Sequence, residues 1–103
     1  MAYHTIEKGK KILHRKYLDE DLGIIEMKIF EVPKTYKYPL GLRYSLYYVW
    51  NAEVIVGYDN HYPKGPHKHF LDEEHAYNFQ NLDQLITDFD NDIEKAKQRI
   101  KAS

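Results

Sequence analysis

Two runs rich in β-branched and aromatic residues, separated by only two residues, constrain the fold of this chain most strongly. The first run is Leu42–Trp50 and the second is Glu53–Tyr58, with Asn51-Ala52 between them. A two-residue connection that begins with Asn predicts a tight β-hairpin, in which the two strands are antiparallel neighbours. Because Ala52 adopts positive φ unfavourably, we expect the loop to be slightly longer than two residues.

Another strand is predicted before the hairpin. Ile25, Met27 and Ile29 alternate with polar or outward-facing positions up to Val32, which is the period-two pattern of a strand with one buried face. Residues 4–17 carry a weaker apolar pattern among lysines, which fits a short helix or an edge strand equally well.

The last part of the chain predicts a short strand and then a helix. Tyr77 and Phe79 alternate around Asn78, which indicates a fourth strand that returns the chain to the sheet. Asn81, with Gln84 three residues later, is typical of a helix N-cap. Beyond it, apolar residues recur at steps of three and four to the end of the chain: Leu82, Leu85, Ile86, Phe89, Ile93, Ala96 and Ile100.

These patterns predict one α+β domain over residues 1–103. We expect an antiparallel β-meander of about four strands, with the C-terminal amphipathic helix packed on one face. The helix should bury Leu85, Ile86, Phe89 and Ile93 against Ile25, Met27, Ile29 and one face of the central strand.

Composition limits the function classes open to the chain. Hydrophobic residues make up 43% and charged residues 30%, which excludes a disordered chain, and no apolar run approaches the ~20 residues of a membrane span. The chain has no Cys, so a thiolate zinc site and a cysteine nucleophile are excluded. With a net charge of -1, any basic footprint for nucleic acid must be local. The N-terminal residues lack a signal-peptide core, which predicts a cytoplasmic protein.

The segment from Gly57 to His69 concentrates reactive side chains. His61, His67 and His69, three of the six histidines, lie there beside Tyr58 and Asp59. Histidine has an unperturbed pKa near neutrality, so it can donate protons, accept them or bind metal without large tuning. This segment is therefore the candidate functional site.

His67 and His69 form an HxH pair. In an extended backbone the two imidazoles project from the same side, about 6 to 7 Å apart. That spacing fits two ligands of one metal ion, with Asp59 and His61 as further ligands, or two ends of a proton relay. Metal binding is one interpretation, and the sequence leaves the metal unidentified.

The alternative is metal-free acid–base chemistry on RNA. One imidazole of the pair takes the proton of a ribose 2′-hydroxyl while the other protonates the leaving oxygen, in either order. Lys64, Lys68 or Arg43 would contact the phosphate, and Tyr58 or Tyr62 would stack on a base. A structural role, with the histidines as solvated loop residues, carries equal weight.

A second motif, Glu26-Met27-Lys28, matches the ExK element of metal-dependent PD-D/ExK nucleases. Those enzymes require an earlier aspartate on a neighbouring strand, whereas only Asp19 and Asp21 precede the motif here, in an expected turn. A charged pair on the solvated face of the sheet is therefore the favoured interpretation.

The aromatic content gives a third feature, with ten tyrosines and one tryptophan. Outward-facing Tyr47, together with Tyr36 and Tyr38 in a basic loop, forms a surface suited to nucleobases or to a protein partner. A non-enzymatic binding module with a tyrosine-rich surface is therefore the competing function.

The order of these motifs resembles the TumE-type family of small bacterial and archaeal toxins. The resemblance runs from about Asp19 to Ile93 and rests on Glu26-Met27-Lys28-Ile29, Arg43-Tyr44-Ser45-Leu46-Tyr47-Tyr48, Tyr58-Asp59-Asn60-His61, His67-x-His69 and Tyr77-x-Phe79. Members are regarded as toxins of toxin–antitoxin modules, so the resemblance implies growth inhibition and a helix-turn-helix antitoxin as partner. The shared pattern falls on Glu26, Lys28, Arg43, Tyr44, Tyr58, Asp59, His67 and His69.

Fold-level analogy with small sheet-based ribonucleases, which include RelE-type toxins, favours RNA over DNA as the substrate. The expected site therefore has His67 and His69 in proton transfer, Asp59 orienting one imidazole, and Arg43 with Lys28 at the phosphate. Glu26 and Tyr58 complete the expected set of site residues. We expect no cofactor and no membrane association, and a homodimer is the oligomer we consider.

Overall fold

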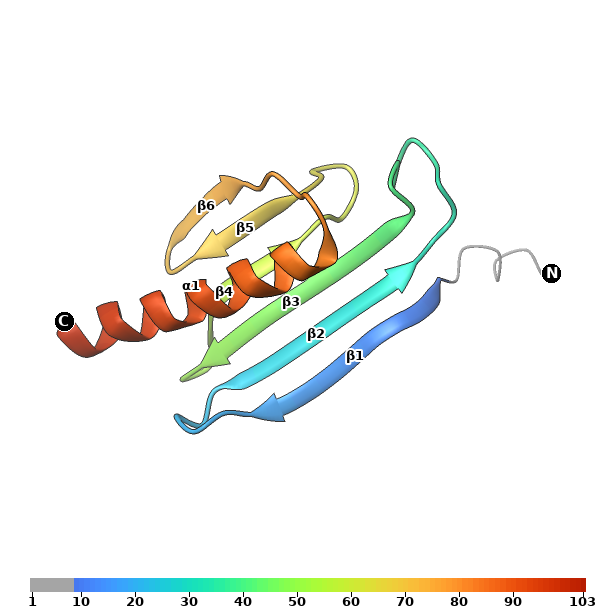
Figure 1. Ribbon diagram of the computed structural model, residues 1–103. Coiled ribbons are helices and arrows are strands. Elements are labelled where there is room, and N and C mark those ends of the chain that lie inside the picture. The colour runs from blue at the N-terminus through green and yellow to red at the C-terminus, as the bar shows by residue number, and fades with distance from the viewer. Residues whose placement is uncertain (1–8) are drawn as a thin grey trace.

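The computed structural model describes residues 9–103, which form a six-stranded antiparallel sheet with one helix on one of its faces (Figure 1). The elements in chain order are β1 (Lys10–Leu18), β2 (Ile24–Glu31), β3 (Leu42–Trp50), β4 (Glu53–Asp59), β5 (His67–Phe70), β6 (Glu73–Ala76) and α1 (Leu82–Ala102). The strands lie in the sheet in the same order as in the chain, so the sheet is a simple meander. Positions 4–8 of the weakly patterned N-terminal segment lie outside the described residues.

The α+β class, the antiparallel sheet and the C-terminal helix are confirmed, but the expected number of about four strands is wrong. The ambiguous segment contributes strand β1, and the histidine segment contributes β5, which the four expected strands did not include. Strand β6 was missed because its four residues, Glu73–Ala76, are all exposed and show no apolar alternation.

The predicted strand at Tyr77 and Phe79 is also wrong, because these residues lie in irregular structure between β6 and α1. Their alternation has a different cause, since both rings pack against the core. The Phe79 ring stacks on Tyr44 with centroids 5.5 Å apart, and the Tyr77 ring meets Tyr58 edge-on at 4.9 Å.

The hairpin between β3 and β4 has a connection of two residues, so the expectation of a longer loop is wrong. Asn51 and Ala52 have φ values of 53° and 63°, the left-handed pair that a type I′ turn requires. Ala52 adopts this conformation at a cost of roughly 1–2 kcal/mol. The strand pairing that starts at Trp50 and Glu53 offsets this cost.

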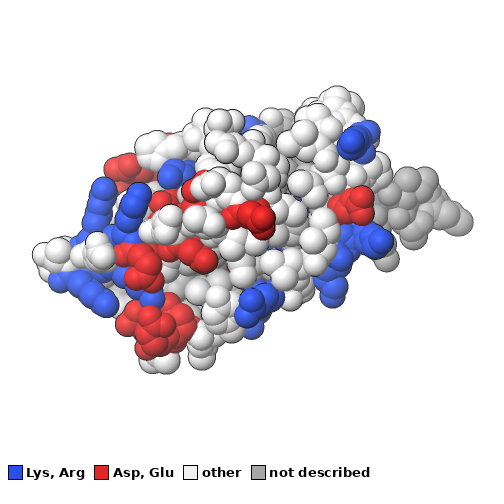
Figure 2. All heavy atoms as spheres, viewed as in Figure 1, with Lys and Arg blue, Asp and Glu red and all other residues white. Residues whose placement is uncertain are grey.

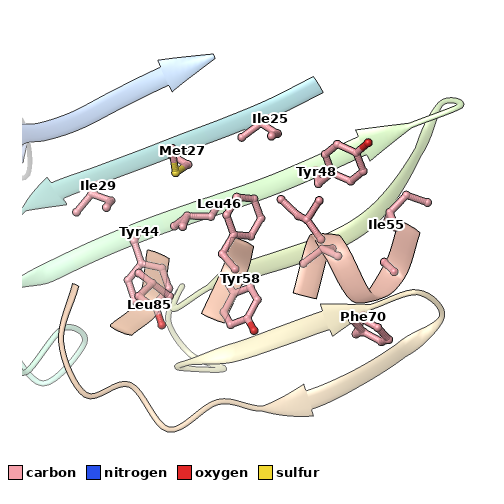
Figure 3. Close-up of a cluster of buried hydrophobic side chains, with 14 residues drawn as sticks. Ile25, Met27, Ile29, Tyr44, Leu46, Tyr48, Ile55, Tyr58, Phe70 and Leu85 are labelled. Carbon is pink, nitrogen blue, oxygen red and sulfur yellow. The ribbon is translucent and has the colours of Figure 1, made fainter. Parts of the chain in front are cut away.

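The core lies between the sheet and helix α1, as the sequence predicts. Figure 3 shows Ile25, Met27 and Ile29 of β2 beside Tyr44, Leu46 and Tyr48 of β3, all on the side of the sheet that carries the helix. The helix contributes Leu85, Phe89, Ile93 and Ala96 and lies against β4. Each fully buried Leu or Ile side chain stabilises such a core by roughly 1.5–3 kcal/mol.

Helix α1 starts where the sequence predicts. The side chain of Asn81 accepts a 2.8 Å hydrogen bond from the backbone N–H of Gln84, which satisfies one of the free donors at the helix start. Within residues 9–103, no helix is both long enough and apolar enough to span a membrane.

Two buried acid–base contacts fix the helix to the sheet. Near its C-terminal end, Lys97 Nζ lies 2.7 Å from Asp19 Oδ2 and 2.9 Å from Asp21 Oδ2, in the turn between β1 and β2. In its middle, Asp92 accepts a hydrogen bond from the Tyr58 hydroxyl at 2.5 Å and one from Lys68 Nζ at 3.1 Å. The polar groups of this face are therefore engaged in holding the two layers together.

Candidate active site

The face of the sheet opposite helix α1 carries the candidate site. Lys28 on β2 is paired with Ser45 on β3, Ser45 with Asp59 on β4, and Asp59 with His67 on β5. Directly paired side chains on one face of an antiparallel sheet lie about 4.5–5.5 Å apart. These four residues, here called the central row, therefore form a continuous polar line across four strands.

A second polar line runs parallel to the central row. Glu26 is paired with Tyr47, Tyr47 with Gly57, Gly57 with His69, and His69 with Glu74. We call these five residues the flanking row. Because His67 and His69 are two residues apart on strand β5, both imidazoles project from the same face, as expected for an extended HxH pair.

The His67 ring is held by the backbone at one nitrogen and faces carboxylates at the other. Nδ1 lies 2.8 Å from the carbonyl oxygen of Gly65, which can only accept, so Nδ1 carries the hydrogen. Nε2 lies 3.5 Å from Asp59 Oδ1 and 3.6 Å from Glu74 Oε2. The side chains of His67 and Asp59 are 17% and 13% exposed, so the pair is mostly buried but reachable from solvent.

Both oxygens of Asp59 have further partners. Oδ2 accepts a 2.8 Å hydrogen bond from the Tyr47 hydroxyl, and Oδ1 accepts one of 3.2 Å from the backbone N–H of His61. Burial, together with the hydrogen bond to Asp59, raises the pKa of Tyr47 to about 12, so the phenol keeps its proton and remains a donor at neutral pH. The orientation of the Asp59 carboxylate is therefore fixed from two sides.

Gly57 makes the position of the Tyr47 ring compatible with the sheet. A Cβ atom added at Gly57 would lie 2.8 Å from two carbons of that ring, well inside van der Waals contact. The absence of a side chain at position 57 therefore allows the ring to lie across strand β4 and its hydroxyl to reach Asp59.

Two cations lie at the β2–β3 end of the site, Lys28 within the central row and Arg43 beside it. Lys28 and Arg43 line a hollow of about 510 Å³ whose other walls are Phe30, Tyr38, Tyr44, Ser45 and His61. The Arg43 guanidinium lies 5.6 Å from the centre of the Phe30 ring. Phe30 is two residues from Lys28 on strand β2 and therefore lies on the same face. The hollow is large enough for a small ligand, and its cations suit an anionic group such as a phosphate.

Some sequence-predicted residues lie elsewhere. Tyr58 is 1% exposed and lies on the helix side of the sheet, where its hydroxyl is bonded to Asp92, so it is a core residue. Tyr44 is equally buried on that side. Lys68 also points toward the helix and pairs with Asp92, and Lys64 pairs with Glu74 at the end of the flanking row.

Glu26 lies on the site face but at its far end from His67. Its Oε2 accepts a 3.0 Å hydrogen bond from His14 Nε2, and this bond lowers the pKa of Glu26. Asp19, the earlier acid of the ExK interpretation, is bound to Lys97 in the β1–β2 turn and does not join Glu26. Within residues 9–103, no group of three or more His, Asp or Glu residues is placed to hold a metal ion.

The structure also adds residues that the sequence interpretation did not place in the site. Ser45 lies in the middle of the central row, Tyr47 holds Asp59, and Glu74 faces His67. Ser45 and Tyr47 were not detectable from the hairpin alone, because an unbroken two-residue hairpin would pair Ser45 with Tyr58. A register shift between Tyr48 and Val49 moves Ser45 opposite Asp59. Glu74 gave no signal either, because it lies on a strand without apolar alternation.

Comparisons with known proteins give one match. No curated protein and no solved structure matches the chain significantly. The model of the family described as Toxin TumE matches residues 3–97 of the 103 residues, which covers the whole sheet and most of helix α1. The chain therefore belongs to the TumE toxin family, and as a toxin of a toxin–antitoxin module it has an antitoxin as its partner.

Proposed function

We propose that this toxin is a ribonuclease whose active site is the central row together with His69 and Arg43. The observation that carries the proposal is the strand register that aligns Lys28, Asp59 and His67 on one face, with the His67 imidazole 3.5 Å from the Asp59 carboxylate. A base, its charge partner and a cation for phosphate are the groups that cleavage of RNA by its own 2′-hydroxyl requires.

In the proposed reaction, His67 Nε2 takes the proton of a ribose 2′-hydroxyl. The 2′-oxygen forms a bond to the adjacent phosphorus while the bond from phosphorus to the 5′-oxygen breaks. His69, about 6 to 7 Å along the strand, gives a proton to that leaving oxygen. The products are a 2′,3′-cyclic phosphate and a 5′-hydroxyl, so atoms and charge balance without a further reactant.

The other residues have supporting roles in this mechanism. The Asp59 carboxylate, fixed by Tyr47, faces the imidazolium that forms when His67 accepts the proton. Lys28 and Arg43 neutralise the charge that develops on the phosphate oxygens. The mechanism assigns no role to Tyr58, because that side chain lies on the other side of the sheet.

Cleavage of total RNA by the purified protein, with and without EDTA, tests the proposal. We expect cleavage in both conditions and a fall of about 10²–10⁴-fold in rate for His67→Ala and for His69→Ala. His75→Ala is the matched control, since His75 is an exposed histidine on β6 that contacts Glu73 and lies on the other face. No cleavage by the wild type, or undiminished cleavage by both site variants, would reject the ribonuclease.

A non-enzymatic binding module is the competing function, and the exposed tyrosines favour it. Tyr36 is 79% exposed and its ring meets Tyr62 edge-on at 5.7 Å, outside the core. On this alternative the double variant of His67 and His69 stays toxic in cells, whereas alanine at Tyr36, Tyr38 or Tyr47 reduces toxicity.

We further propose that the antitoxin is a helix-turn-helix protein and that both proteins act in the cytoplasm, where RNA is available. The support is the family's association with two-gene modules. Co-expression of the neighbouring reading frame tests it, because a small helix-turn-helix product that restores growth and co-purifies is expected. The mass of the free toxin in the same preparation shows whether it forms the homodimer considered from the sequence.

A further inference from the structure

A cleft continues from the site along the loops at one end of the sheet. It consists of the 510 Å³ hollow beside Lys28 and two more hollows of about 270 and 350 Å³. Tyr38 lines all three, and Arg43 lines the first and the third, so the three hollows adjoin one another. The walls are the β2–β3 loop (residues 32–41) and the β4–β5 loop (residues 60–66).

The cleft differs in charge from the rest of this nearly neutral molecule. Among the described residues that line its three hollows there is no Asp or Glu, whereas Lys28, Lys37 and Arg43 all contribute. Figure 2, which shows the helix side of the molecule, has acidic side chains over the middle of helix α1 and basic ones toward its C-terminal end, so charges of both signs are mixed there. The cleft therefore favours an anionic ligand even though the net charge of the chain is -1.

The side chains at the mouth of the cleft are aromatic and accessible. Tyr36 and Tyr62 are 79% and 47% exposed and meet edge-on, and Lys37 Nζ lies 5.5 Å from the centre of the Tyr62 ring. Accessible aromatic rings beside cations are the features that bind successive bases and phosphates of single-stranded nucleic acid.

Hydrogen bonds hold the two walls in place. The Asn60 side chain accepts a 2.9 Å bond from the Tyr44 backbone N–H and donates a 2.8 Å bond to the Leu42 carbonyl, which fixes the β4–β5 loop to strand β3. The backbone N–H of Tyr62 donates to the hydroxyl of Tyr38 at 3.3 Å, which joins the two loops. The cleft is thus formed before a ligand enters, which lowers the entropy cost of binding.

The same loop connects the cleft to the His67 site. His61 lines the first hollow, and its backbone N–H is bonded to Asp59. Gly65 lines the second hollow, and its carbonyl accepts from His67 Nδ1. The β4–β5 loop therefore joins the wall of the cleft directly to Asp59 and His67.

We propose that this cleft is a subsite for an unpaired nucleobase next to the scissile phosphate, so that the substrate of the toxin is single-stranded RNA. The phosphate lies at Lys28 and Arg43, and the neighbouring base stacks on the tyrosines of the two loops. A base inside a duplex is stacked on its neighbours and cannot enter such a cleft. This inference rests on RNA as the substrate in the proposed function.

Binding measured without cleavage separates the two proposals. The full chain carrying His67→Ala is titrated against a labelled single-stranded RNA and against a duplex of the same sequence, with fluorescence anisotropy as the readout. We expect the single strand to bind at least about tenfold more tightly. Tyr36→Leu and Tyr62→Leu, which keep apolar bulk but remove the ring, should each weaken single-strand binding by about fivefold or more.

Two variants act as matched controls. Tyr36→Phe keeps the ring and should bind as the parent does. Tyr17→Leu removes an exposed tyrosine on strand β1, which also has a cation over its ring, from Arg15 at 5.2 Å, and should leave RNA binding unchanged.

Each outcome decides something. Equal affinity for single strand and duplex, or tyrosine variants that bind RNA as the parent does, overturns the base subsite, even if the wild type cleaves RNA. Tight, tyrosine-dependent binding of the single strand with no cleavage by the wild type supports the subsite and rejects the ribonuclease. No RNA binding at all, with loss of antitoxin binding in Tyr36→Leu, overturns the subsite and makes the cleft a protein interface.

Discussion

The hydroxyl of Tyr47 donates a 2.8 Å hydrogen bond to Asp59 Oδ2 across strands β3 and β4. This contact links the flanking row to the central row, because Tyr47 belongs to the first and Asp59 to the second. It leaves Oδ1 of Asp59 to face His67. The position of one carboxylate oxygen against the imidazole is therefore set by a phenol that does not itself contact the imidazole.

Tyr47→Phe tests this positioning. The ring remains but the hydrogen bond is lost, so we expect RNA cleavage to fall by roughly tenfold, since one well-oriented hydrogen bond of about 1.4 kcal/mol is removed. The free energy of unfolding should decrease by only about 0.5–1.5 kcal/mol. Cleavage rates and urea denaturation of the same preparation measure the two effects. Unchanged cleavage would show that the Tyr47 hydroxyl is not required to orient Asp59.

Gly57→Ala should disturb the hydrogen bond between Tyr47 and Asp59 by displacing the Tyr47 ring. The added Cβ would lie 2.8 Å from the Tyr47 ring, so the ring must move away from Asp59. We expect a loss of activity at least as large as in Tyr47→Phe, with destabilisation of about 1–3 kcal/mol from overpacking. In the double variant with Tyr47→Ala, which removes the ring, the alanine at 57 should cost little more; an additive loss would contradict this explanation.

Tyr58→Phe should affect stability and leave catalysis intact. The hydroxyl is buried and bonded to the Asp92 carboxylate, and a hydrogen bond to a charged group contributes about 1.5–3 kcal/mol. Cleavage per folded molecule should stay at the wild-type level, because the side chain lies on the helix side of the sheet. A loss of cleavage in fully folded Tyr58→Phe would return this residue to the active site.

The contact between Lys97 and Asp19 should make stability depend on pH in the acid range. Burial opposes ionisation of Asp19, but hydrogen bonds from Lys97 and from backbone amides outweigh it, so the pKa of Asp19 lies below its usual value of 3.8. An acid whose pKa is lowered by folding stabilises the protein above its unfolded pKa, and this contribution is lost as the pH falls through the folded value.

The measurement is urea denaturation of the wild type and of Asp19→Asn between pH 7 and pH 2. The difference in unfolding free energy should be constant down to about pH 5 and should shrink steadily below about pH 4. Lys97→Met, which keeps the length of the side chain, should cost about 3 kcal/mol at pH 7 because it leaves a buried carboxylate unpaired. A difference that does not change with pH would show that folding leaves the pKa of Asp19 unchanged, and would contradict the lowered value.

Lys28 and Arg43 should contribute to RNA binding through charge. Each phosphate contact on a single strand adds about 0.7 to the slope of log affinity against log salt concentration. Lys28→Ala and Arg43→Ala in the His67→Ala background should therefore each reduce the slope by about that amount. Lys101→Ala, at the far end of helix α1, is the control and should leave the slope unchanged.

The parts of the fold that were predicted correctly have local signals. The Asn51-Ala52 hairpin lies between two β-rich runs, and helix α1 has a long three-four repeat with an N-cap at Asn81. Strands β5 and β6 have no such signal. Their turn contains Leu71 at φ 55°, a residue that rarely adopts this conformation, and it is held there by a 2.8 Å bond from its N–H to the Ile55 carbonyl. Ile55 lies on strand β4, outside the β5–β6 hairpin, so the sequence around Leu71 does not predict this bond.

The candidate site was predicted in part for a similar reason. His67, Asp59 and Lys28 were identified by residue type, and the register brings them into one row. Tyr58 was included although it is adjacent to Asp59 in one strand, and adjacent strand residues point to opposite faces. The period-two rule alone would have separated these two residues. The role of Tyr47 needs the ring to lie over Gly57, which only the three-dimensional packing reveals.

Helix α1 supplies one entire layer of the core, and this has a consequence for the cell that makes the toxin. Ribosomes synthesise chains from the amino end. Strands β2, β3 and β4 therefore leave the ribosomal exit tunnel while their apolar face is still exposed to solvent. The sheet acquires its cover only after residues 82–96 have emerged. The toxin therefore cannot complete its core until nearly the whole chain has left the ribosome.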